Sequence, residues 1–457
     1  MLYCKLFDYD LTKGGRTMRG GRLVALFCLL CLLLSGCSTF GNAGFYALPK
    51  RSEKYSELQA AVEAAMGGGE YSAPVAGSNR QAVQQADLDG DGAEEALVFC
   101  KLGSSMPLKV LILKRTDDGY RLLTTVDSDG TAFDSVLYAE VDGEPGLELV
   151  LSRRIGEQVQ QYLSVYTLDD GAAVELLSAR CSLYTTTDMD GDQHTDLFVL
   201  QSNAEGPTAY ANLYRWRDGS LQKDAEASLS MASESVKRVL TGNLANNVPA
   251  VFVASAYDES NLITDVFALR GDVFTNVTQN ADSGQSSQTV RNYYVYSTDI
   301  DNDGVIEMPD TVALTELPND VGSQGQYRIV WYALNVNGQR TDKMSTYHNY
   351  GEGWFLFLPE SWCTDSLAVT RVSLGNSQTG TRFSALNDKG VRTELATIAA
   401  FSGENADTLS DTDGFFPLVT RGGIVYAARL GDGVSLTPDE LAARFSSIAP
   451  DLLPEAE

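Results

Sequence analysis

The sequence predicts a mainly β protein, with a five-bladed β-propeller-like repeat domain followed by a small α+β C-terminal domain. Three observations predict this fold class. An acidic loop motif recurs five times between residues 80 and 350, a hairpin-type turn follows each copy, and each repeat has room for four short strands. A repeat of about 50 residues with four strands is typical of a propeller, in which each blade buries its faces against its neighbours.

The first marker of the repeat is a loop of alternating acidic residues that leads into an apolar strand. It reads DLDGDG from Asp87, DMDGD from Asp188 and DIDNDG from Asp299. Eroded copies begin at Glu140 and Thr241, so the five starts are separated by 53, 48, 53 and 58 residues. The second marker is a turn of the Asp-Gly, Gly-Asp or Asn-Gly type, which follows these starts by 31, 30, 30, 30 and 38 residues. Two independent markers at matching intervals indicate one repeated unit.

The strands of each repeat are predicted from the apolar runs between these markers. In the first repeat they are residues 96–99, 109–114, 120–126 and 135–141. The fifth repeat has only three clear strands before the pattern changes near Gly351, whereas residues 80–88 form a spare strand ahead of the first loop. We predict that this spare strand pairs with strands between residues 310 and 350, because closing the ring removes exposed sheet edges.

These repeats resemble the FG-GAP/VCBS family of extracellular propeller repeats, whose loops read DxDxDG with a further acid at the ninth position. The resemblance covers residues 80–350 and implies calcium binding in the three loops that match. The two eroded loops have lost ligands and are not included. The predicted metal ligands are Asp87, Asp89, Asp91 and Glu95 in the first loop, Asp188, Asp190, Asp192 and Asp196 in the third, and Asp299, Asp301, Asp303 and Glu307 in the fifth.

Calcium binding by such a loop has a physical basis. Ca²⁺ takes six to eight oxygen ligands, and carboxylates at alternate positions of a tight loop converge on one point. The alternative is that the Asp residues only cap turns through hydrogen bonds to the backbone. Close packing of several carboxylates without a cation is strongly repulsive, which favours calcium. An EF-hand is excluded in two loops, because its twelfth position is Val98 or Val199, inside an apolar strand.

The N-terminal segment reads as a signal peptide with a lipobox at residues 1–36. Arg16, Arg19 and Arg22 precede an apolar run at 23–34, which is too short for the roughly 20 residues that span a bilayer. Leu-Ser-Gly-Cys follows and ends at Cys37, a pattern that resembles bacterial lipoproteins. It implies lipidation of Cys37, palmitate among the acyl chains, and anchoring on the extracytoplasmic face of the cell membrane. The alternative is an ordinary secretory signal.

Residues 37–79 are predicted to form a lipidated linker with a short helix at 52–66. Residues 351–457 are predicted to form the α+β domain, with strands at 367–372, 381–386, 393–401 and 423–430. A helix should follow from an N-cap at Thr437 to about Ser447, because Pro438 suits the first helical turn.

Cysteine usage and charge restrict the chemistry further. Outside the N-terminal segment only Cys100, Cys181 and Cys363 remain, and we predict buried free thiols, with a single Cys100–Cys181 bridge as the alternative. The formal net charge of -27 opposes binding to nucleic acid and favours cations or basic partners.

The sequence predicts a binding protein and no catalytic residues. It has two histidines and no GxSxG, HExxH or phosphate-loop pattern. The predicted function is a cell-surface lipoprotein whose calcium-binding propeller serves as a binding, adhesion or scaffold module for a protein or glycan. The alternative is an extracellular polymer-degrading hydrolase that uses carboxylates on the propeller frame as acid and base.

Overall fold

The computed structural model describes residues 53–448, apart from 104–106, 157–160, 204–205, 207, 293–294, 319, 376–377 and 404–412. The chain divides into two compact units, residues 1–56 and 57–457. The predicted signal peptide, Cys37 and most of the linker lie outside the described residues. Where the structure describes the chain, it contains no helix that is long and apolar enough to cross a membrane.

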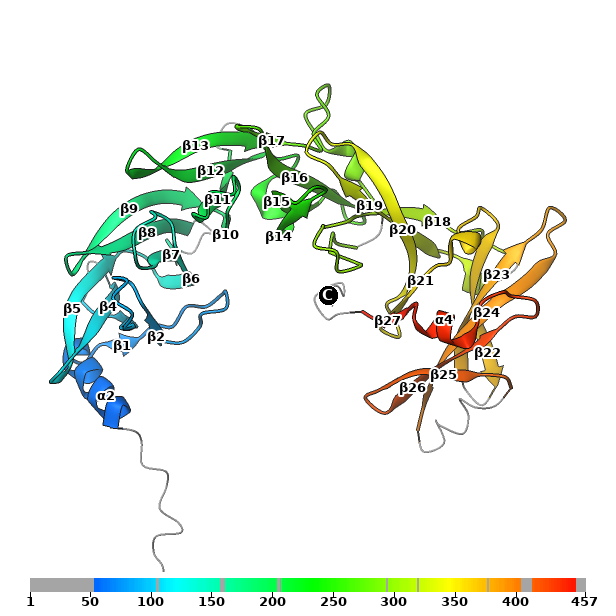
Figure 1. The fold of residues 1–457 in the computed structure, drawn as a ribbon, viewed down its shortest axis with the longest axis horizontal. Coiled ribbons are helices and arrows are strands. Elements are labelled where there is room, and N and C mark those ends of the chain that lie inside the picture. The colour runs from blue at the N-terminus through cyan, green and yellow to red at the C-terminus, as the bar shows by residue number, and fades with distance from the viewer. Residues whose placement is uncertain are drawn as a thin grey trace, which may run out of the picture. The chain divides into compact units, whose positions relative to one another are not determined.

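The protein is mainly β, and its described strands form antiparallel sheets of four or five strands in chain order (Figure 1). The first sheet contains β1 (Glu70–Tyr71), β2 (Val83–Ala86), β3 (Glu95–Lys101), β4 (Leu108–Thr116) and β5 (Gly119–Ser128). The second contains β6 (Ala132–Ala139), β7 (Glu148–Arg154), β8 (Gln161–Asp169) and β9 (Ala172–Cys181). The third contains β10 (Leu183–Thr187), β11 (Asp196–Ser202), β12 (Ala209–Arg217) and β13 (Ser220–Ser228).

The remaining sheets follow the same plan with additions from the C-terminal part of the chain. The fourth contains β14 (Val236–Leu244), β15 (Val248–Ala256), β16 (Leu262–Arg270) and β17 (Val273–Asn276). The fifth contains β18 (Met308–Ala313), β19 (Tyr327–Leu334), β20 (Arg340–Asn349), β21 (Trp354–Phe357) and β27 (Phe445–Ser447). The sixth contains β22 (Leu367–Gly375), β23 (Gln378–Leu386), β24 (Arg392–Ser402), β25 (Phe416–Arg421) and β26 (Ile424–Leu430).

In each of the first three sheets the acidic loop connects the first strand of the repeat to the second. Ala86 pairs with Glu95 across the first loop, so β2 belongs to the same sheet as β3. The prediction that residues 80–88 pair with strands of the fifth repeat is therefore wrong. A loop of eight residues closes at a much smaller entropic cost than a contact more than 200 residues away. Residues 135–141 begin the second sheet, where β6 pairs with β7, and are not the fourth strand of the first repeat.

Buried apolar clusters join consecutive sheets. Phe99 of the first sheet and Phe133 of the second meet edge to face, with ring centroids 5.3 Å apart. Phe198 of the third sheet and Phe267 of the fourth lie at the same separation. Further clusters join the second sheet to the third, the fourth to the fifth and the fifth to the sixth. Each sheet thus buries its faces against its neighbours, as stacked repeats require.

Both predicted helices are present, and the second is shorter than predicted. Helix α2 spans Glu53–Met66, as predicted, and its Val62 and Met66 pack on the first sheet. Helix α4 spans Pro438–Ala442 and begins with the predicted cap, a capping box between Thr437 and Glu440. It ends earlier than predicted, because Phe445–Ser447 form β27 and pair with β21.

The three cysteines of the described chain are free thiols. Cys100 and Cys181 are buried, as predicted, and Cys363 is half-buried. The alternative of a Cys100–Cys181 bridge is therefore wrong. Burial raises the pKa of the Cys181 thiol to about 12, which keeps it protonated and unreactive.

Candidate metal centre

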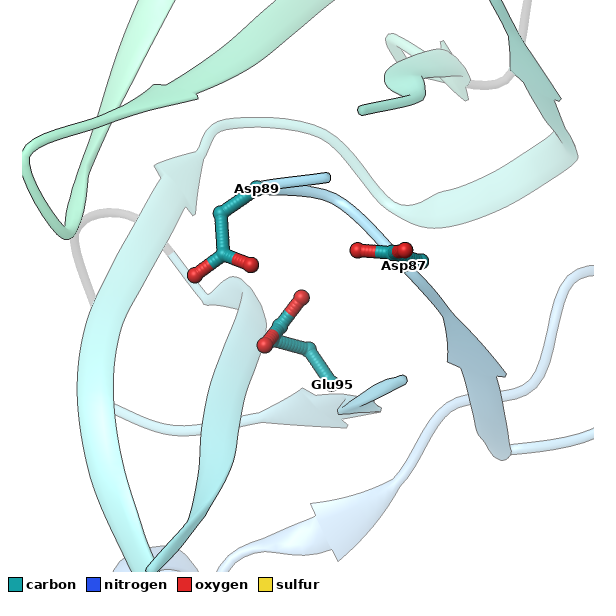
Figure 2. Close-up of side chains that lie close together, drawn as sticks. All are labelled: Asp87, Asp89 and Glu95. Carbon is teal, nitrogen blue, oxygen red and sulfur yellow. The ribbon is translucent and has the colours of Figure 1, made fainter. Parts of the chain in front are cut away.

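The first acidic loop brings three of its four predicted ligands together. Oxygens of Asp87, Asp89 and Glu95 all lie within 4.8 Å of one another. Figure 2 shows the three carboxylates converging, with Asp87 and Asp89 on the loop after β2 and Glu95 at the start of β3. The backbone N–H of Gly92 donates to Asp87 Oδ2 at 2.9 Å, which folds the loop back over its first residue.

The third loop repeats this arrangement, whereas the cluster of the fifth loop includes the fifth-position carboxylate and not the ninth-position Glu307. Asp188, Asp190 and Asp196 form the cluster in the third loop, and Asp299, Asp301 and Asp303 form it in the fifth. The N–H of the sixth residue again donates to the first carboxylate, from Gln193 at 3.0 Å and from Gly304 at 2.9 Å. Gln193 has a φ of 73° and replaces the glycine that this position favours, yet the hydrogen bond is kept.

The fifth-position carboxylates Asp91 and Asp192 lie beside these clusters. Each accepts a hydrogen bond from the N–H two residues later, at 2.8 Å and 2.9 Å. The ammonium of Lys114 lowers the pKa of Asp91.

The ninth-position acid is buried in every one of these loops. Glu95 and Glu307 are 0 % exposed and Asp196 is 2 % exposed. One oxygen of each accepts the N–H of the second loop residue: Leu88 at 2.9 Å, Met189 at 2.9 Å and Ile300 at 3.2 Å. Burial raises the pKa of Asp196 and of Glu307 to about 7.

Three further carboxylate oxygens, in the first and fifth loops, decide whether the loops suit a cation. Glu307 Oε1 and Asp87 Oδ1 are buried and have no hydrogen-bond partner. Glu95 Oε1 has no hydrogen-bond partner either, although the ammonium of Lys114 lies 3.6 Å from it. A buried carboxylate oxygen without a partner is costly unless a cation or a donor satisfies it. Turn capping explains the oxygens that accept N–H groups, but it leaves these three unexplained. The oxygen-only donor set and the unpartnered atoms therefore fit a hard cation such as calcium.

The second loop keeps a buried acid at its ninth position, which the sequence analysis did not predict. Glu148 lies at its ninth position, is 2 % exposed and accepts the N–H of Val141 at 2.7 Å, as in the other three loops. Burial raises the pKa of Glu148 to about 7. Counting nine residues from Glu140 would have identified it. Pro145 stands at the sixth position, however, and cannot donate the hydrogen bond that folds the other loops over their first residue.

The fourth loop has lost the site. Gly242 pairs with Ala250, so Ala250 occupies the place of the ninth acid, and Asn243 occupies that of the first residue, two residues later than predicted. This segment is one residue shorter than the acidic loops. Asn246 and Asn247 have φ values of 66° and 56°, and they turn the chain in a tight hairpin. No carboxylate remains at the first, third or ninth position of this loop.

Backbone hydrogen bonds connect neighbouring loops at equivalent positions. The carbonyl of Asp87 accepts the N–H of Leu147 at 3.0 Å, and that of Glu140 accepts the N–H of Thr195 at 2.7 Å. The carbonyl of Asn243 accepts the N–H of Ile306 at 2.8 Å. The same link from the third loop to the fourth would need an N–H at position 249, which is a proline.

A pocket of about 500 Å³ adjoins the fifth loop. It is lined by Asp301, Met344, Phe357, Leu358, Glu440, Ala443 and Arg444. Asp301 is the only residue of this lining that also belongs to a carboxylate cluster. A ligand in this pocket would therefore lie next to the fifth loop.

Comparisons with known proteins identify no family. No family model and no curated protein matches the chain. Among solved structures, the Dos1 propeller is 10% identical over 77% of this chain and 79% of its own, with a TM-score of 0.29. A protein from Lactobacillus plantarum is 12% identical over 71% and 86%, with a TM-score of 0.27, and rhamnogalacturonan lyase YesW is 9% identical over 79% and 91%, with a TM-score of 0.28. At these TM-scores the similarities carry no argument about activity or ligand.

Proposed function

We propose that this protein is a membrane-anchored extracytoplasmic lipoprotein whose repeats form a five-bladed, calcium-binding propeller followed by a C-terminal domain. In this proposal it acts as a binding or scaffold module for a protein or glycan at the cell surface. One observation carries the calcium assignment: buried carboxylate oxygens without partners lie in loops where several carboxylates converge. The apolar clusters that join consecutive sheets support the propeller.

Calcium is expected to raise the stability of the soluble form that begins at Ser38. Binding to the native state alone stabilises by about 2.7 kcal/mol per site when calcium exceeds its dissociation constant a hundredfold. Thermal unfolding with calcium and with a chelator measures the effect. Asp299→Asn should reduce the calcium-dependent shift, whereas Asp272→Asn, at an exposed hairpin tip between β16 and β17, should not.

Identical unfolding curves with calcium and chelator would contradict the calcium assignment. The acidic loops would then be turns capped by side chains. Magnesium serves as the specificity control, because it prefers a smaller octahedral shell and retains its waters.

The lipid anchor is tested separately at Cys37. In a bacterial host, the chain should be found in the membrane fraction and carry acyl chains on Cys37 after signal cleavage, as mass spectrometry would show. Cys37→Ser should carry no acyl chains and should keep its N-terminal segment uncleaved, because lipidation of the Cys37 thiol precedes cleavage. A wild-type chain without acyl chains on Cys37 would contradict the anchor.

The hydrolase alternative has weaker support. Asp301 and Glu440 line one pocket, but both side chains are exposed. Glu440 also accepts hydrogen bonds from the N–H of Thr437 at 2.8 Å and from its hydroxyl at 3.0 Å, and these lower the pKa of Glu440. A general acid needs a raised pKa, so Glu440 does not suit that role.

A further inference from the structure

The three carboxylate clusters differ in the basic side chains that reach them. In the first loop the ammonium of Lys114 contacts Asp89 directly, lies 2.7 Å from Asp91 Oδ2 and lies 3.6 Å from Glu95 Oε1. Lys114 therefore contacts three of the four predicted ligands. Its side chain is only 24% exposed, so the ammonium is held among these carboxylates.

In the third loop, two arginines contact the predicted ligands. Arg215 donates to Asp190 Oδ2 at 2.9 Å, and Arg217 donates to the same oxygen at 2.6 Å. Arg217 also lies 3.6 Å from Asp192. Arg215 is buried and is fixed from its other side by Asp224, so its position does not depend on the loop alone.

Strand register shows that Lys114 and Arg215 occupy one structural position. Ala96 pairs with Leu113, and Leu197 pairs with Tyr214, so the next residue along β4 is Lys114 and along β12 is Arg215. Each stands opposite the ninth-position acid of its loop. In the fifth sheet Met308 pairs with Tyr332, which puts the small apolar Ala333 at this position.

The fifth loop consequently lacks a cation of this kind. Among the described residues, its only ion pair joins Lys343 to Asp303 at 3.3 Å, and the two side chains are 34% and 38% exposed. Glu307 Oε1 stays buried without a partner beside Asp299, Asp301 and Asp303. The negative charge of the carboxylates is thus least compensated in this loop.

We propose that the fifth loop is the high-affinity calcium site, and that Lys114 and Arg215 act as tethered cations that weaken calcium binding in the first and third loops. This inference rests on the proposed calcium function. A charged group attached to the same sheet competes at a high effective concentration, and calcium must either displace it or bind beside its positive charge. We expect a difference of at least tenfold in the dissociation constants.

The experiment is a calorimetric calcium titration of the protein as isolated from expressing cells, kept in mild detergent. The wild type should show one tight site, and Asp301→Asn should abolish it. Lys114→Met should add a second site within about tenfold of the first, because it removes the ammonium from the first loop. Lys109→Met is the matched control on the same strand, since Lys109 pairs with Asp127 outside the loop, and it should change nothing.

The reverse substitution places a positive charge at the equivalent position of the fifth sheet, Ala333. Ala333→Lys should weaken the tight site at least tenfold while leaving the circular dichroism spectrum unchanged. Three equal sites in the wild type, or a Lys114→Met titration identical to the wild type, would overturn the inference while leaving calcium binding intact. An absence of binding in all variants would instead remove the calcium function, and the inference with it.

Discussion

Replacing Asp265 by alanine is expected to lower the free energy of unfolding by about 3–5 kcal/mol, because several buried donors lose their acceptor together. Asp265 lies on β16 and is 0 % exposed. Its Oδ2 accepts the N–H of Ser230 at 2.9 Å. Its Oδ1 accepts the hydroxyl of Ser230 at 2.6 Å, Asn276 Nδ2 at 2.8 Å and the hydroxyl of Ser286 at 2.5 Å.

These bonds tie three separate segments to one carboxyl group. Ser230 follows the third sheet, Asn276 ends β17, and Ser286 belongs to the connection toward the fifth loop. Ser230 and Ser286 are themselves 1% and 0 % exposed, so water cannot replace the lost acceptor without entering the interior. Urea unfolding measures the loss.

Two further variants make this test specific. Asp265→Asn should lower the free energy of unfolding by less than Asp265→Ala. Its carbonyl oxygen can still accept hydrogen bonds, whereas its NH2 group replaces one acceptor and faces donors. Asp272→Ala, exposed on the adjacent hairpin, should stay within about 0.5 kcal/mol of the wild type. An Asp265→Ala protein as stable as this control would show that the network contributes little.

The second large effect is a loss of stability in acid caused by His348. This side chain is 6% exposed, stacks on Phe355 with ring centroids 5.0 Å apart, and has no hydrogen-bond partner at either ring nitrogen. Burial lowers the pKa of His348 to about 3. The imidazole thus stays neutral in the folded protein well below the usual histidine pKa of about 6.5.

The sign of the pH dependence follows from which state binds the proton. Below about pH 6.5 the unfolded chain is protonated at His348 and the folded chain is not, so acid favours unfolding. The contribution amounts to about 1.4 kcal/mol per pH unit, or nearly 5 kcal/mol in full by pH 3. Above pH 6.5 both states are neutral and the effect vanishes.

His348→Phe should remove this part of the acid sensitivity. Unfolding free energies measured between pH 7 and pH 4.5 should fall about 2.7 kcal/mol less in the variant than in the wild type. Phe401→Leu provides the control, since Phe401 is buried in another cluster, against Phe415, and its loss should lower stability equally at all pH values. Parallel curves for His348→Phe and the wild type would show that the imidazole takes up its proton over the same pH range in the folded and the unfolded protein.

The sequence predicted the carboxylate clusters well, because alternate positions of a tight loop converge whatever the rest of the fold does. It identified the members of all three clusters. It missed Glu148, because Glu140 and Glu144 obscured an Asp-based pattern in a loop that otherwise keeps the ninth acid. It misplaced the start of the fourth loop, because Ala250 shows its position only through its pairing with Gly242.

The order of strands within the sheets was harder to predict. Repeat spacing is the same whether a loop connects two strands of one sheet or two different sheets. The pairings of Ala86 with Glu95, Ala139 with Glu148 and Thr187 with Asp196 show that the first strand of these repeats precedes the loop. Likewise, the helix signal at Thr437 extended over Phe445, but packing of Phe445 against Trp354, with ring centroids 5.5 Å apart, favours a strand there.

Because β27 lies late in the chain, it affects the order in which the sheets are completed during synthesis. Its partner β21 ends at Phe357, whereas β27 begins at Phe445, and Ile448 next to it is buried against Trp331 and Phe355. At synthesis rates of roughly 5 to 20 residues per second, the partner strand waits on the order of ten seconds for this edge. The first four sheets can complete their hydrogen bonding during that interval. The sheet that follows the fifth acidic loop is therefore the last to be finished, and a chain that stops short of Phe445 leaves β21 as an open edge.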